Sequence, residues 1–266
     1  MNLIVIMVML IPTLYSKTSF SWMGHSLATA IAIKNLPESK DQVKVESLER
    51  FLSETQKNLP DLLKDEEAYA KKNIPNYPER PASLEFKGHQ DPAFLVKNFT
   101  QALRVNPNSK LALFLKQRAL PDEVLTLLQR ESVTLTPKSL STSEVFAKIN
   151  EGDSVSASAV FSTASDEPDY GLDLNLWTDN GTEFGKSYGF GIQPFGNPKL
   201  EFSSQIPFHI GYFHESKFLY KTASFLNRTL PEHRIHLFFT LAKYAFSTGH
   251  PYWGYRFLGW GAHYIQ

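Results

Sequence analysis

Hydrophobic residues recur at helical spacing along most of this chain. Apolar side chains three and four positions apart predict a helix over residues 24–36, which Pro37 ends. The same spacing among charged residues predicts further helices over residues 39–58, 62–71, 92–105 and 120–131. The first half of the chain therefore favours short amphipathic helices joined by polar loops.

The last part of the chain has the strongest helical pattern. Residues Thr229 to Glu232 form a capping-box sequence, so a helix is expected to begin at Thr229 and to end at Gly249. The residues expected to face inward on it are Ile235, Phe238, Phe239, Ala242 and Phe246. A final helix is expected to carry Trp253, Phe257, Trp260, His263 and Tyr264, with Trp260 in the core.

The segments between these helices have few apolar positions. Residues 132–165 are rich in Ser and Thr and predict a long loop, whereas residues 166–206 hold many Gly, Asp, Asn and Pro and predict ordered, non-repetitive structure. No convincing alternation of strand type and no internal repeat is present. The pattern predicts a mainly α fold with a single domain over residues 22–266.

Composition narrows the chemistry. Lys and Arg together number 27, as do Asp and Glu, so a net charge of zero gives no support to a surface that binds polyanions throughout. The chain has no cysteine, which excludes disulfides, thiol catalysis and cysteine-bound zinc. Any metal would be held by His, Asp, Glu and backbone groups.

The amino terminus has the pattern of an export signal. An apolar run from Leu3 to Ile11 is too short for a membrane span, which needs about 20 residues. The small residues Ser19 and Ser21 then follow at the spacing of a signal-peptide cleavage site. We expect residues 1–21 to be removed, which would make the protein secreted or periplasmic and leave Trp22 as its first residue. A buried amino-terminal strand is the alternative.

Four groups of residues could carry chemistry. The first is Trp22 with His25, because a free α-amine can bind a metal beside an imidazole. The second is the acidic run from Ser165 to Asp173, and the third is the pair His209 and His214 among aromatic residues. The fourth is His263, with His236 and His250 nearby in the sequence, both of which we interpret as structural. Taken singly, each group also fits a packed side chain or a solvated turn.

Together, these motifs resemble the zinc-dependent phospholipase C superfamily, which also contains the fungal single-strand nucleases. The resemblance rests on the order Trp22, His25, Pro168-Asp169-Tyr170, His209 or His214, and Leu258-Gly259 followed by His263-Tyr264. It implies a multi-helix fold in which the amine and carbonyl of Trp22, with His25, bind one zinc ion. Asp169, His263 and either His209 or His214 would bind another zinc ion, with up to three ions in the family.

The resemblance also implies a function. It predicts a secreted, zinc-dependent hydrolase of phosphodiester bonds, in which Asp169 is the catalytic residue that activates or orients water. Phospholipid, at a membrane surface, is the expected substrate, and a single-strand nuclease is the alternative. Residues around 60–160 have no counterpart in the family and are expected to form a helix-and-loop insertion.

The same resemblance sets an expectation for the carboxyl end. Family members follow the helical His with an Asp four residues later, which here would lie one position beyond Gln266. The fold and zinc sites are therefore expected to be incomplete, and a truncated, non-catalytic relative is a further alternative. The last alternative is a secreted protein without catalytic activity that binds a partner through residues 60–160.

Overall fold

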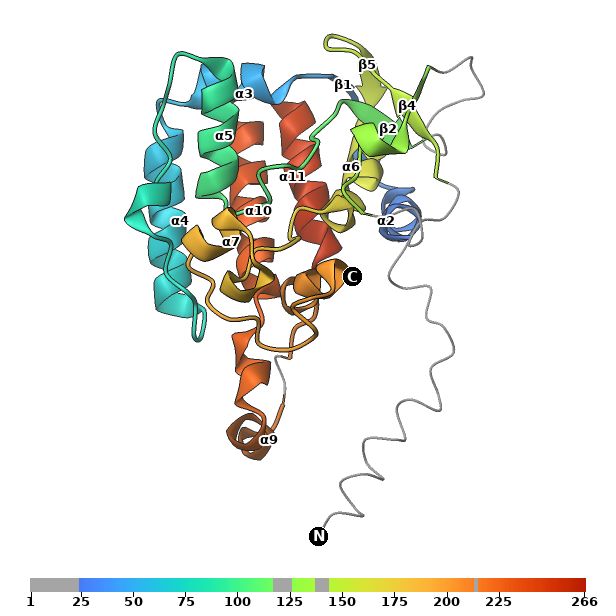
Figure 1. Cartoon of the computed structure of the whole chain (residues 1–266). Coiled ribbons are helices and arrows are strands. Elements are labelled where there is room, and N and C mark those ends of the chain that lie inside the picture. The colour runs from blue at the N-terminus through green and yellow to red at the C-terminus, as the bar shows by residue number, and fades with distance from the viewer. Residues whose placement is uncertain (1–23, 117–125, 137–143, 213–214) are drawn as a thin grey trace.

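The computed structural model describes residues 24–116, 126–136, 144–212 and 215–266. Among these residues the structure is mainly helical, as the sequence predicts, with a few short strands (Figure 1). No helix in these ranges is both long enough and apolar enough to span a membrane.

Helices α10 (Pro231–Ser247) and α11 (Pro251–His263) form an antiparallel pair at the centre of the molecule (Figure 1). The turn between them contains Gly249 at φ 85°, a left-handed conformation that costs a glycine little. Phe238 of α10 is buried as predicted, and Trp253, Phe257 and Trp260 are buried on α11, which includes the core position predicted for Trp260. Their rings pack edge to face against one another and form the centre of the core.

Three helices cover one side of this pair (Figure 1). Helices α3 (Leu48–Thr55) and α5 (Pro92–Ala102) begin at side-chain caps, since Ser47 accepts from Arg50 N–H and Asp91 accepts from Ala93 N–H. Helix α4 (Leu59–Asn73) has a proline in its first turn and packs against α10. The segment expected to be an insertion therefore contributes many residues to the main hydrophobic core, and Phe114, Val133 and Phe146 from it belong to a second, smaller cluster.

Two helices lie on the other side. Helix α6 (Ala157–Ala164) packs between α11 and α2 (His25–Ile33). The close approach requires Gly259, because a Cβ there would lie 2.6 Å from Ala164 Cβ and 2.8 Å from Phe161 O. The prediction of a loop over residues 132–165 is wrong for α6, whose small side chains give little amphipathic signal although Ser156 caps it.

Short antiparallel strands join these layers. Strand β1 (Gln42–Lys44) pairs with β5 (Ser154–Ser156), and β4 (Phe146–Lys148) lies between β2 (Phe114–Lys116) and β3 (Leu127–Leu128). Each strand has two or three residues, too few for an alternating pattern to be recognised in the sequence. The helix predicted over 120–131 is wrong for residues 126–131, where β3 is followed by a 3₁₀ turn; residues 117–125 lie outside the described ranges.

Other helix boundaries also differ from the prediction. The segment expected as one helix over 39–58 contains β1 before α3, and α4 is longer than the predicted helix over 62–71. Helix α10 begins at Pro231, without the predicted side-chain cap, and Phe246 is exposed rather than inward. Leu27 and Ile31 of α2 are exposed too, whereas Ser26 and Thr29 are buried; polar partners decide the orientation of this helix.

The remaining described chain consists of short helices and turns, as predicted for residues 166–206. In chain order these elements are η2 (Pro37–Lys40), η3 (Ala82–Leu84), η5 (Arg130–Ser132), η7 (Glu167–Tyr170), η8 (Thr178–Asn180), α7 (Glu183–Ser187), η9 (Glu201–Gln205), α8 (Ile206–His209), α9 (Lys217–Thr222) and η10 (Ser224–Arg228). Two of them, η7 and α8, carry side chains to the carboxyl end of α11.

Candidate metal centre

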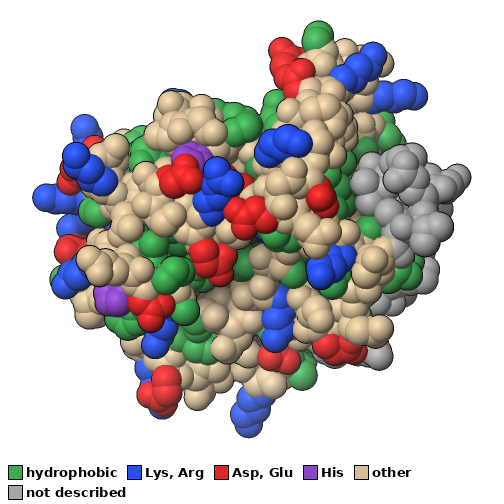
Figure 2. Space-filling view, turned by 90° about the horizontal axis from the view of Figure 1, so that it is seen from above, with side chains coloured by type: hydrophobic (Ala, Val, Ile, Leu, Met, Phe, Trp, Pro, Cys, Tyr) green, Lys and Arg blue, Asp and Glu red, His purple; other side chains and the backbone are tan. Residues whose placement is uncertain are grey.

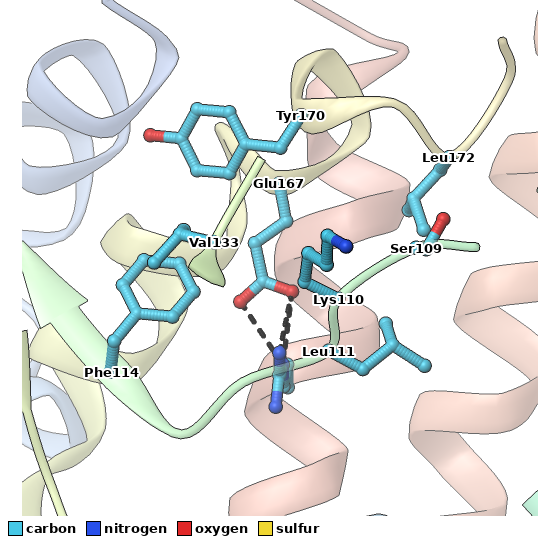
Figure 3. Close-up of a pocket in the computed structure, with 9 residues that line it drawn as sticks. Ser109, Lys110, Leu111, Phe114, Val133, Glu167, Tyr170 and Leu172 are labelled. Carbon is cyan, nitrogen blue, oxygen red and sulfur yellow. Dashed lines mark hydrogen bonds and ion pairs between the residues drawn. The ribbon is translucent and has the colours of Figure 1, made fainter. Parts of the chain in front are cut away.

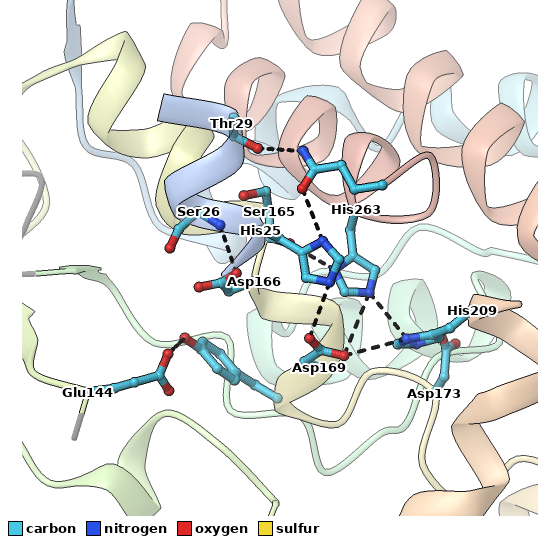
Figure 4. A network of polar contacts seen from close by, with 12 residues as sticks. His25, Ser26, Thr29, Glu144, Ser165, Asp166, Asp169, Asp173, His209 and His263 are labelled. Carbon is cyan, nitrogen blue, oxygen red and sulfur yellow. Dashed lines mark hydrogen bonds and ion pairs between the residues drawn. The ribbon is translucent and has the colours of Figure 1, made fainter. Parts of the chain in front are cut away.

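Four of the candidate ligands meet at one place although they come from four separate elements. His25 is the first residue of α2, Asp169 lies in η7, His209 ends α8 and His263 ends α11 (Figure 4). The side chains of the three histidines are at most 11% exposed and that of Asp169 is 20% exposed. The cluster is therefore almost enclosed, with Asp169 at its centre.

Two of the histidines lie beside the same oxygen of the Asp169 carboxylate. Its Oδ1 lies 3.5 Å from Nδ1 of His209 and 3.7 Å from Nε2 of His263, and those two nitrogens are 3.2 Å apart. Tetrahedral zinc with bonds of about 2.0–2.2 Å to N and O ligands holds them about 3.3–3.6 Å apart. The three atoms thus form a triangle of the size that one face of such a site requires.

His25 contacts the other oxygen of the same carboxylate. Its Nε2 lies 3.7 Å from Asp169 Oδ2, and its ring packs against that of His263 with centroids 4.2 Å apart. One ligand atom each from His25, Asp169 and His263 lie within 4.8 Å of one another, so this group could hold a metal ion. Asp169 has one oxygen toward His25 and the other toward His209 and His263, an arrangement that could bridge two ions.

Two of the histidines have a hydrogen-bond acceptor at the other ring nitrogen, and the third has a carboxylate near it. The carbonyl oxygen of Ser165 lies 2.8 Å from Nδ1 of His263, and the amide oxygen of Gln266 lies 3.0 Å from Nδ1 of His25. Asp173 Oδ2 lies 3.3 Å from Nε2 of His209, at an angle less direct than that of a regular hydrogen bond. When these nitrogens carry the protons, the nitrogen facing Asp169 has a free lone pair, as a metal ligand requires.

The charges of this cluster depend on its enclosure. Burial lowers the pKa of His263 to about 4. Burial also acts to lower the pKa of His209, but the neighbouring carboxylates of Asp169 and Asp173 outweigh it and raise that pKa to about 9. The pKa of Asp169 is lowered, because the attraction of the histidines exceeds the opposing effect of burial. A metal ion bound here would take the place of the proton shared by His209 and the carboxylates.

Asp173 anchors the back of the cluster. Its Oδ1 accepts from Nε and Nη2 of Arg234 at 3.0 and 2.7 Å, and its Oδ2 accepts from Tyr264 Oη–H at 2.5 Å. Burial would raise the Asp173 pKa, but Arg234 is the chief of the partners that lower it to about 2. Arg234 also donates to the carbonyls of Leu103 and Arg104, which ties the cluster to the helices on the far side of α10.

A second buried ion pair fixes η7 to α11. Nε of Arg256 donates to both oxygens of Glu167 at 3.0 Å, and Nε1 of Trp260 donates to Glu167 Oε2 at 2.9 Å. Figure 3 shows the Glu167 carboxylate in a small pocket between η7 and the strand and loop that carry Phe114 and Leu111. Since Asp169 follows Glu167 in η7 and His263 follows Arg256 in α11, this pair sets the spacing of two candidate ligands.

The other candidate residues are the predicted ligands Trp22 and His214 and the two histidines interpreted as structural, His236 and His250. Trp22 and His214 lie outside the described residues. His236 contacts Glu66 at 2.6 Å and stacks on Tyr69, consistent with the structural interpretation. His250 precedes the first residue of α11 and lies 2.8 Å from Glu46 Oε1.

Glu46, Glu54 and His250 form a further group of potential ligands. Arg50 lies 3.0 Å from Glu54 and 3.8 Å from Glu46, so these carboxylates already have a cation beside them. This group is therefore explained by its own ion pairs.

Three supporting residues were not assigned roles from the sequence, namely Asp173, Arg234 and Gln266. Asp173 belongs to the acidic run, but nothing in the sequence separates its role from those of the other acids in that run, Asp166, Glu167 and Asp169. Arg234 lies on the apolar pattern of α10 as an isolated charge, which is the one signal that could have marked it.

Comparisons with known proteins find no relative. No family profile, no curated protein and no solved structure matches this chain. The geometry of the cluster is therefore the basis for assigning a function.

Proposed function

We propose that this protein is a secreted zinc-dependent hydrolase of phosphodiester bonds, with the fold of the phospholipase C and single-strand nuclease superfamily. Asp169, His209 and His263 would hold one zinc ion, and His25, with the amine of Trp22 after removal of residues 1–21, would hold a second. The supporting observation is the triangle of ligand atoms 3.2–3.7 Å apart. The far nitrogens of His25 and His263 also have hydrogen-bond acceptors, and the Asp173 carboxylate lies 3.3 Å from that of His209.

The chemistry proposed for the site follows from its residues. Bound zinc would lower the pKa of a coordinated water to about 7 and polarise a phosphoryl oxygen. Asp169 is the acidic residue whose carboxylate has both oxygens within the cluster, so we assign it the orientation of the attacking water as well as metal binding. Ser165 and Gln266, as acceptors at the far nitrogens of His263 and His25, favour the tautomers that leave the ligating nitrogens free, and the Asp173 carboxylate favours the same tautomer of His209.

Charge favours a phospholipid over a nucleic acid as the substrate. Figure 2 shows acidic and basic side chains mingled over the face viewed from above, without a continuous basic area on that face. With a net charge of zero, the chain has no overall attraction for a polyanion. We therefore propose a phospholipid headgroup ester as the substrate and keep single-stranded nucleic acid as the alternative.

Zinc binding is tested first. Purified protein that begins at Trp22 is expected to bind zinc, and Asp169→Asn, His209→Gln and His263→Gln are each expected to weaken binding by more than about 10–100-fold, since they remove ligands rather than their support. His236→Gln is the matched control, because that histidine lies on α10 and contacts Glu66 instead of Asp169. Binding that is unchanged in Asp169→Asn and His263→Gln would contradict the zinc site.

Activity is tested separately with a phosphocholine ester and with single-stranded DNA. Hydrolysis of the ester alone supports the proposal, and hydrolysis of DNA alone supports the nuclease alternative. Zinc-loaded protein that cleaves neither substrate would contradict a hydrolase and favour the non-catalytic reading. If no zinc binds, the four residues form a buried cluster of ion pairs with one hydrogen bond, between Nδ1 of His209 and Nε2 of His263.

A further inference from the structure

Helix α2 begins at His25 without a capping side chain of its own. The residue before it is Gly24, which has no side chain to accept from the first turn. The acceptor comes instead from Asp166, whose Oδ1 receives the Ser26 N–H at 2.8 Å. A carboxylate at this place both satisfies a free backbone donor and faces the positive end of the helix dipole.

The same carboxylate is paired with a buried cation. Lys116, at the end of β2, is 6% exposed, and its Nζ contacts Asp166 Oδ2, Glu144 Oε1 and the Ser26 Oγ. An ammonium group has three donors, and here all three have an acceptor. Asp166 is 4% exposed, so without Lys116 its charge would be costly to bury.

Asp166 also lies at the start of the turn that carries Asp169. It is the residue before η7, and its carbonyl accepts the Asp169 N–H at 3.1 Å. Asp166 is therefore bonded through its side chain to the residue after His25 and through its backbone to Asp169 (Figure 4). A single residue links the starts of two elements that are far apart in the sequence.

We infer that Asp166 is a positioning residue that holds His25 against Asp169 and His263, with Lys116 compensating its buried charge. The consequence for metal binding rests on the proposed function, whereas the position of His25 does not. Gln266 and Asp169 contact the His25 ring itself, whereas Asp166 accepts from the backbone of the first turn and so fixes the position of α2 from which that ring lies 4.2 Å from the ring of His263.

Removing Asp166 alone would leave Lys116 buried beside an apolar residue, so the variants need to lack the cation as well. We therefore compare two double variants. Asp166→Asn with Lys116→Met is called the Asn pair, and Asp166→Ala with Lys116→Met is called the Ala pair. Both pairs lack the ion pair, and in both Glu144 keeps Tyr170 Oη at 3.3 Å and Arg130 at 3.7 Å. They differ in the oxygen that can accept the Ser26 N–H, which Asn retains and Ala lacks.

The direct measurement is the nuclear Overhauser effect between the imidazole protons of His25 and His263, in metal-free protein. We expect the effect in the parent and in the Asn pair, and its loss in the Ala pair. Zinc affinity is expected to fall by about 10–100-fold in the Ala pair relative to the Asn pair. Both double variants lack the ion pair, so its loss cannot produce a difference between them. An equal Overhauser effect between the two rings in both variants would therefore overturn the inference.

The outcomes separate this inference from the proposed function. If the parent binds no zinc but the ring contact is lost only in the Ala pair, the zinc site is wrong and Asp166 still positions His25. If the parent binds zinc and both pairs bind it equally, the zinc site stands and the inference fails. Should both pairs fail to fold, amide exchange in the parent decides: slow exchange at Ser26 supports the bond to Asp166, and free exchange contradicts it.

Discussion

Arg234→Met removes the buried cation behind the cluster. Both Arg234 and Asp173 have side chains that are 0% exposed, and the guanidinium makes two bonds to Asp173 and two to backbone carbonyls. Breaking a buried pair from one side leaves an uncompensated charge and typically costs about 3–5 kcal/mol. We expect a loss of unfolding free energy in that range, a large part of the stability of an ordinary domain.

Urea unfolding at fixed pH measures this loss, and a double-mutant cycle identifies its source. Asp173→Asn in the Arg234→Met background is expected to recover part of the stability, because it removes the unpaired carboxylate. Arg228→Met is the control: this arginine is on the surface and donates to the Ile192 carbonyl instead of a carboxylate. A loss of unfolding free energy below about 1 kcal/mol for Arg234→Met would refute the reasoning, because removal of an exposed ion pair costs no more than that.

Three further predictions concern packing, capping and pH. Gly259→Ala is expected to cost about 1–3 kcal/mol by thermal or urea unfolding, because its Cβ would meet the α6 backbone and Ala164; Gly88→Ala, which meets only the flexible end of Gln56, is the control. Asp91→Ala is expected to cost about 0.5–2 kcal/mol, and Asp91→Asn much less, because the side chain accepts from Ala93 and Phe94 at the start of α5; equal losses would contradict a cap. Burial, and after it the charge of Arg234, lowers the pKa of His233 well below 6.5. Below pH 6.5 the unfolded chain therefore binds a proton at this histidine that the folded chain excludes. The free energy of unfolding is expected to fall as the pH drops below 6.5. His233→Phe is expected to reduce this slope by up to about 1.4 kcal/mol per pH unit, measured as urea unfolding between pH 7.5 and 5.5; an unchanged slope would refute the assignment.

Local signals in the sequence were sufficient for much of the helical fold. The central pair α10 and α11 was predicted because apolar residues recur at helical spacing over a long stretch, which Gly249 and Pro251 divide into two helices. Helix α5 was predicted within a few residues, since Pro92 begins it and a polar turn follows. Such signals act between residues three or four apart, and one sequence contains them in full.

Only the tertiary structure decided which polar groups meet. The resemblance of motifs predicted His25, Asp169 and His263 as ligands, but it did not decide between His209 and His214. The structure places His209 beside Asp169. The sequence pattern predicted a helix over residues 24–36, but its apolar residues Leu27 and Ile31 are exposed, and Asp166 and Gln266 bond to α2 on another face. Buried polar groups need partners at hydrogen-bond distance, and those partners lie 140 and 237 positions away, beyond the reach of any local pattern.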